Sequence, residues 1–168
     1  CFVPKAHTPF QWRPQNTLQE FERKRKLLSE KRLKGIKLSF HDSRTSVLEG
    51  IIARGDRRLG DVIYTAWSKG CKFDGWSEYF DFDRWQEAFR ENSVNPLVYT
   101  RERSYSEPLP WDFIDAGISK DFLIEENEKA RLAETSQDCR NFGCNNCGIC
   151  SSLGVLPDIK GGLHAVES

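Results

Sequence analysis

The stretch Ile36-Lys37-Leu38-Ser39-Phe40 decides the predicted fold. Its apolar residues alternate with polar ones, which is the pattern of a β-strand with one buried face. His41-Asp42-Ser43 would end this strand, and a helix is expected from about Thr45 to Ala53. A strand followed directly by a helix is typical of α/β proteins.

A second apolar run stands at the start of the sequence. Cys1-Phe2-Val3-Pro4 ends in a proline, as a buried strand often does. Because the chain begins with cysteine and contains no methionine, we interpret it as a fragment that begins inside a larger domain, with cleavage before Cys1 as the alternative. Together the two runs predict a helix-rich α/β fold that includes the last part of a sheet or barrel.

Further helices are predicted from capping signals and apolar spacing. Thr17 and Glu20 form a capping-box pattern, and the helix they begin is expected to reach about Lys34, with Gly35 at its C-terminal end. Its expected buried stripe consists of Leu18, Phe21 and Leu28. A later helix is expected at residues 59–68, closed by Gly70. Another is expected at 82–92, capped by Asp81, with Phe82, Trp85 and Phe89 facing inward. A third is expected at 120–134, capped by Ser119. Residues 95–112, with three prolines, should be extended or looped.

Composition narrows the class of protein. The 168 residues suit one domain, or one domain with an appendage, and the formal net charge is zero. A neutral chain has no overall field that would draw it to nucleic acid or to a membrane. Four of the six cysteines lie in one cluster, which favours a reducing cytoplasm over a secreted, disulfide-bonded protein.

The cysteine cluster is the strongest sign of bound inorganic chemistry. Cys139, Cys144, Cys147 and Cys150 have the spacing C-x4-C-x2-C-x2-C within twelve residues. Two consecutive C-x2-C steps place three thiolates around a small volume, and bacterial ferredoxins hold iron–sulfur clusters with the same step. Structural zinc more often uses two C-x2-C pairs separated by a longer loop. We therefore expect an iron–sulfur cluster, with zinc, disulfides or free thiols as alternatives.

The number of ligands bears on what such a centre could do. Four thiolates would complete the coordination and make the centre structural or electron-transferring. If Cys139 were not a ligand, the other three would leave one corner open. We favour the version with four ligands.

Several stretches of the chain together resemble one family. The similarity is carried by Phe2–Trp12, Arg54–Gly60, Phe73–Trp76, Pro110–Asp112 and Ile114–Asp115. These stretches look like the C-terminal part of cobalamin-binding-domain radical S-adenosylmethionine proteins, a largely uncharacterised bacterial family, and the resemblance covers essentially the whole chain. It implies a parent enzyme with an N-terminal cobalamin-binding domain, a four-iron cluster, S-adenosylmethionine as cofactor and a (β/α) barrel.

The resemblance also has a limit. Family members hold the radical-generating cluster in a C-x3-C-x2-C loop, whereas the gaps between the clustered cysteines here are four, two and two. The resemblance therefore implies a fragment that completes a barrel and carries an auxiliary iron–sulfur or zinc site, without catalysis of its own. It divides the chain into the barrel edge at 1–58, a helical extension at 59–135 and a cysteine-rich module with a tail at 136–168.

Two residues of the first loop are candidates for contact with substrate, S-adenosylmethionine or cobalamin. His7 and Gln11 would follow a strand, where barrels place their active-site loops. The alternative is a loop packed by Pro9 and Trp12, with His7 hydrogen-bonded to the backbone.

Three more candidates follow later. His41 and Asp42 could transfer a proton or bind a metal, although Asp42 is equally suited to begin the next helix. Arg57, in the turn Gly55-Asp56-Arg57-Arg58, could bind a phosphate or a carboxylate, the alternative being a salt-bridged turn.

A basic run suggests a competing, non-catalytic function. Eight of the fifteen residues from Arg23 to Lys37 are basic, and such a helix could bind RNA phosphates. Three acidic residues at positions 20, 22 and 30 weaken this signal, and helix surfaces are often charged. The competing hypothesis is a metal-stapled module that binds RNA or a protein. The five tryptophans and Cys71 are expected in the core.

Overall fold

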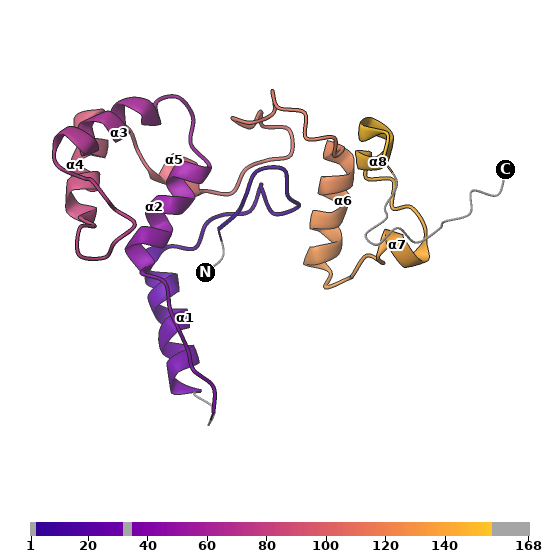
Figure 1. Cartoon of the computed structure of the whole chain (residues 1–168), viewed down its shortest axis with the longest axis horizontal. Helices are drawn as coiled ribbons and strands as arrows, with labels where there is room; N and C mark the ends of the chain where they lie inside the picture. Colours follow the sequence, from indigo (N-terminus) through magenta and orange to yellow (C-terminus); the bar gives the residue numbers. More distant parts are fainter. Residues whose placement is uncertain (1–2, 32–34, 156–168) are drawn as a thin grey trace. The chain divides into compact units, whose positions relative to one another are not determined.

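The computed structural model describes residues 3–31 and 35–155, and the regular secondary structure of these residues is helical (Figure 1). The described part of the chain has eight helices, and two of them, α7 (Cys139–Phe142) and α8 (Ile149–Leu153), belong to the segment that holds the four clustered cysteines. The helices are α1 (Leu18–Glu30), α2 (Ser43–Ala53), α3 (Leu59–Ser68), α4 (Phe82–Glu91), α5 (Leu97–Thr100), α6 (Lys120–Arg131), α7 (Cys139–Phe142) and α8 (Ile149–Leu153).

The predicted α/β fold is wrong. Residues 36–40 form no strand, and the described ranges contain no sheet and no end of a barrel. Alternating residues need a neighbouring strand to complete their hydrogen bonds, and here the segment lies beside a helix. The Arg25 guanidinium of α1 stands 5.4 Å from the centre of the Phe40 ring. In the other predicted strand, Val3 and Pro4 have no strand structure, while Cys1 and Phe2 lie outside the described residues.

Helix α1 keeps its predicted start and loses its predicted buried stripe. The Thr17 hydroxyl accepts a hydrogen bond from the Glu20 amide at 3.2 Å, and the Glu20 carboxylate accepts one from the Thr17 amide at 2.8 Å, which confirms the capping box. The helix ends at Glu30 instead of Lys34, and residues 32–34 lie outside the described part. No residue of α1 is buried: Leu18 and Phe21 are half-buried, and Leu28 is 53% exposed. The reason is that α1 meets α2 through its first turns and then extends into solvent.

Sequence predicted the middle helices well. The range of α3 is confirmed, and Gly70 follows it with a φ of 97°. Asp81 caps helix α4 as predicted, its carboxylate accepting hydrogen bonds from the amides of Asp83 and Arg84. Trp85 and Phe89 of α4 are buried as predicted, and Phe82 is half-buried. The capping signals succeeded because they depend only on neighbouring residues.

Two compact units can be distinguished in the described chain. The first contains residues 3–6 and 11–110, and the second contains residues 7–10 and 111–155. In the first unit, α1 packs on α2, α2 on α5 and α3 on α4. Its core is one cluster that includes the predicted core thiol of Cys71: Leu48, Ile51, Leu59, Val62, Ala66, Cys71, Trp85, Ala88, Phe89 and Tyr99.

The second unit is built around α6. Ser119 caps this helix as predicted, with its hydroxyl accepting from the Phe122 amide at 3.2 Å. Leu123 and Asn127 of α6 are buried, and the Asn127 side chain donates a hydrogen bond to the Pro9 carbonyl. The helix ends at Arg131, three residues before the predicted end. No described helix has both the length and the apolar character needed to cross a membrane.

Candidate functional site

The cysteine segment is a series of tight turns. Cys139 opens α7, and Asp138 caps that helix by accepting from the Arg140 amide at 3.0 Å. Gly143 then has a φ of 97°, Asn146 a φ of 55° and Gly148 a φ of 94°. Left-handed residues therefore flank Cys144 and Cys147, as expected for a chain that must turn repeatedly to bring several side chains to one side.

One cysteine already accepts a backbone hydrogen bond. The Asn146 amide donates to the Cys144 sulfur at an N···S distance of 3.3 Å. Backbone N–H groups that point at sulfur stabilise negative charge on a thiolate, and such bonds are part of the environment of cysteine-bound metals. Cys144 is exposed, whereas Cys139, Cys147 and Cys150 are half-buried.

The turns are fixed to the beginning of α6. The Ser119 amide donates to the Cys147 carbonyl at 2.8 Å. A Cβ atom on Gly148 would lie 3.1 Å from the Gly117 carbonyl oxygen, so the two backbones approach closely there. The central C-x2-C step is thereby held against α6 by the backbone alone.

The structure brings together the turns but not the sulfur atoms. Within residues 3–31 and 35–155, no three histidine, cysteine, aspartate or glutamate side chains converge as a group that could hold a metal ion. The described cysteines form no disulfide with one another. The donor set and the backbone fit a thiolate-bound metal, and the thiol side chains would have to converge on it.

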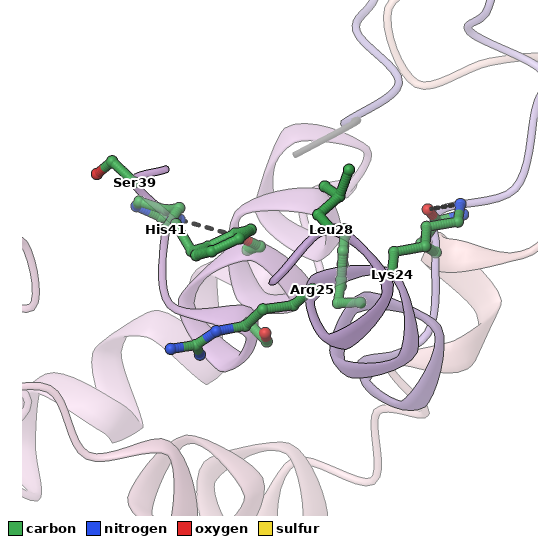
Figure 2. A pocket seen from close by; sticks show the side chains of 10 residues that line it. Lys24, Arg25, Leu28, Ser39 and His41 are labelled. Carbon is green, nitrogen blue, oxygen red and sulfur yellow. Dashed lines mark hydrogen bonds between the residues drawn. The ribbon is translucent and has the colours of Figure 1, made fainter. Parts of the chain in front are cut away.

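His41 and Asp42 lie in the first unit and have different surroundings. His41 lines a pocket of about 240 Å³ between α1 and residues 39–46, and its Nδ1 lies 2.9 Å from the Ser46 hydroxyl (Figure 2). The Asp42 carboxylate instead caps α2, accepting from the Thr45 amide at 2.8 Å. Partial burial opposes ionisation of Asp42, but the Thr45 hydrogen bonds outweigh it and lower its pKa. Asp42 is therefore the N-cap of α2, as the alternative prediction stated.

His7 belongs to the second unit and Gln11 to the first, and their contact with a cofactor or substrate stays a prediction. His7 is half-buried, with a φ of 53°. The Gln11 side chain is buried, and its carbonyl accepts from Arg54. A cofactor would have to displace packed neighbours to reach Gln11.

The turn before α3 is a salt-bridged turn. The Arg58 guanidinium donates to both oxygens of Asp56, with a closest N···O distance of 2.6 Å, and the Tyr99 hydroxyl donates to the same carboxylate at 3.1 Å. The hydrogen bonds from Arg58 lower the pKa of Asp56 to about 2, although partial burial acts against them. Arg57 is exposed beside this pair, and anion binding by Arg57 stays a prediction.

Arg54 is the important residue that sequence reasoning missed. It is fully buried, and its guanidinium donates to four backbone carbonyls at 2.6–3.2 Å, those of Gln11, Arg13, Tyr99 and Arg101. Burial lowers its pKa to about 10, and the neighbouring Arg103 and Arg101 act in the same direction. Arg54 thus joins residues 11–13, the end of α2 and residues 99–101. No local signal separates it from the exposed arginines at 57 and 58.

The tryptophans divide into two groups. Trp12, Trp85 and Trp111 are buried as expected, whereas Trp67 and Trp76 are more than half exposed. Exposure of the last two corrects the prediction that all five lie in the core. The basic residues of α1 are exposed, and their binding to RNA stays a prediction.

Comparison with known proteins adds no relative. No protein-family model, no curated protein and no solved structure matches this chain.

Proposed function

We propose that the second unit is a metal-binding module in which Cys139, Cys144, Cys147 and Cys150 hold an iron–sulfur cluster. The observation that carries the proposal is the C-x2-C turn itself. It combines left-handed residues on both sides of Cys147 with a backbone N–H that already points at the Cys144 sulfur. Four thiols in twelve residues supply the full donor set.

The composition of the second unit supports a need for such a centre. Among the described residues of the second unit, the buried hydrophobic side chains are those of Trp111 and Leu123. Segments with so little apolar burial depend on a metal or on cross-links for stability. A cluster with four thiolate ligands would stabilise the turns and could transfer electrons.

The larger protein forms the second part of the proposal. By the resemblance of its sequence motifs, the chain would be the C-terminal part of a radical S-adenosylmethionine protein with a cobalamin-binding domain. The radical-generating cluster and its C-x3-C-x2-C loop would then lie elsewhere in that protein. This chain would supply the auxiliary centre and the helical first unit, with no barrel strand among its described residues.

The test is metal analysis of the full chain purified anaerobically. We expect about four irons and four sulfides per chain, and a broad absorption near 400 nm, as thiolate-bound clusters show. One zinc per colourless chain would overturn the cluster and leave a structural metal site. Absence of both metals after reconstitution would overturn the module.

Variants locate the site. The double variant Cys144→Ser/Cys147→Ser should lose the metal, because it removes both ends of the central C-x2-C step. Cys71→Ala is the matched control, since Cys71 is buried in the core of the first unit and burial raises the pKa of its thiol. Equal metal content in the double variant and the control would contradict the assignment.

A further inference from the structure

The pocket between α1 and residues 39–46 is lined by basic but not by acidic side chains. Two cations and no acidic residue are among its lining side chains: Asn16, Phe21, Lys24, Arg25, Leu28, Ser39, Phe40, His41, Ser43 and Ser46. In a chain whose acidic and basic residues are equal in number, a pocket without a carboxylate favours an anionic ligand. Its volume of about 240 Å³ lies just below the usual range of small-molecule pockets, so it would enclose part of a ligand and leave the rest open to solvent.

The polar groups lie around an apolar centre. Figure 2 shows Leu28 between Lys24 on one side and His41 with Ser39 on the other. Lys24 is held by Asn16, with 2.6 Å between the Lys24 Nζ and the Asn16 Oδ1. The Arg25 guanidinium lies over the Phe40 ring, so a charged donor and an aromatic face are presented together.

The hydrogen bonds of His41 and Ser46 assign the donor and acceptor nitrogens of the ring. The Ser46 hydroxyl donates its proton to the Asp42 carbonyl at 2.9 Å, so it accepts from the Nδ1 of His41. In the neutral ring the other nitrogen, Nε2, is then an acceptor and can take a hydrogen bond from a ligand hydroxyl or amino group. The serines at 39 and 43 add hydroxyl groups to the same pocket.

We propose that this pocket binds a phosphate monoester joined to a flat ring, the chemistry of a nucleotide. The phosphate would pair with Arg25 and the surrounding hydroxyl groups, and the ring would lie against the Phe21 and Phe40 side chains. Guanidinium groups bind phosphate through parallel hydrogen bonds, and bases stack on aromatic rings. The nucleotide could be free or part of an RNA strand. The inference is independent of the metal proposal, because the pocket lies in the other unit.

The test is a titration of the isotope-labelled full chain, followed by amide NMR at low salt. Adenosine monophosphate should shift the signals of residues 21–28 and 39–46 and bind with a dissociation constant below about 1 mM. Adenosine and inorganic phosphate should each bind at least about tenfold more weakly, because each lacks half of the contacts. If phosphate alone gives the same shifts at the same concentrations, the ring contact is refuted. If the monophosphate shifts none of these signals, the pocket assignment fails.

Matched variants separate the pocket from the general charge of α1. Arg25→Gln should weaken monophosphate binding by about tenfold, whereas Arg23→Gln removes the same charge from the same helix outside the pocket and should change it by less than about twofold. Phe40→Leu should weaken the monophosphate but not inorganic phosphate. Equal effects of the two arginine variants would overturn the proposal. If a short single-stranded RNA binds the same residues far more tightly than the monophosphate, the natural ligand is a nucleotide within an RNA strand. If the two affinities are equal, the natural ligand is the free nucleotide.

Discussion

The two units are stabilised in different ways. The first has a continuous apolar core and a buried arginine that satisfies four carbonyls of two separate segments. In the described part of the second, buried apolar side chains are few, and much of the backbone is held by caps and left-handed turns. The comparison teaches that the first unit is stabilised by its interior, whereas under the metal proposal the stability of the second would depend on what its cysteines bind.

Removal of metal is expected to have the largest effect and to act on one unit. If metal stabilises the second unit, a strong chelator should raise the amide exchange rates of residues 137–155 by about a hundredfold or more. The exchange rates of α2 to α4 should stay unchanged. Uniform acceleration in both units, measured by hydrogen-exchange mass spectrometry, would break the comparison.

Arg54→Met is the corresponding test of the first unit. It removes a buried cation and leaves carbonyl groups without their donor, so we expect a loss of about 3–5 kcal/mol in the free energy of unfolding. Urea unfolding monitored by circular dichroism measures this loss. The matched control Arg57→Met, at an exposed position of the next turn, should cost less than about 0.5 kcal/mol. A similar cost for both variants would show that the buried arginine is not central.

Gly148→Ala tests the turns of the second unit. The φ of 94° and the approach of the Gly117 carbonyl to 3.1 Å make a Cβ atom unfavourable there, at about 1–2 kcal/mol. The variant should retain less metal under mild chelation than the wild-type chain. Gly154→Ala is the control, since its φ is also positive but the added Cβ meets no atom within 4 Å. Metal retention that is the same in both variants would argue against a role for the close backbone approach.

Acid provides the smallest and most local test. The pKa of Asp56 is about 2 in the folded chain and about 4 in an unfolded chain. The stability that its ionised form contributes is therefore complete above about pH 4 and is lost as the pH falls toward 2. Because the carboxylate is partly exposed, we expect about 1 kcal/mol from this group.

Asp56→Asn should lower stability at neutral pH and flatten the acid branch of the stability curve of the first unit. Asp138→Asn is its counterpart in the second unit, where Arg140 likewise lowers the pKa of the carboxyl to about 2. That pair belongs to the other unit, so the stability of the first unit should keep its pH dependence in this variant. An unchanged acid branch in Asp56→Asn would show that the pair with Arg58 does not contribute to stability.

Local signals and long-range contacts differed in how well the sequence predicted them. The caps at Thr17, Asp81 and Ser119 were predicted correctly because each hydrogen bond joins residues within one turn. The strand at residues 36–40 was predicted wrongly because its alternating pattern carries no information about whether a second strand is present. Instead of joining a strand, Phe40 contacts the guanidinium of Arg25 in α1.

The candidate sites followed the same division. The cysteine spacing could be read directly, and the backbone of the turns agrees with the need for tight bends around Cys144 and Cys147. The sequence around Asp42 fits both a site residue and a cap, and its bond to the Thr45 amide shows the cap. The burial of Gln11 could not be foreseen, because it depends on residues far along the chain such as Arg54.

By itself, the sequence determined the helix starts, the cysteine spacing and the concentration of basic residues in α1, since all three are properties of near neighbours along the chain. The tertiary structure decided that the fold is helical in its described residues, that Arg54 is buried while Arg57 and Arg58 are exposed, and that Phe40 and His41 meet α1 around a pocket. The reason is that burial and pocket formation depend on segments far apart in the sequence. Arg54 shows this most clearly, because its four carbonyl partners lie more than 40 positions away along the chain.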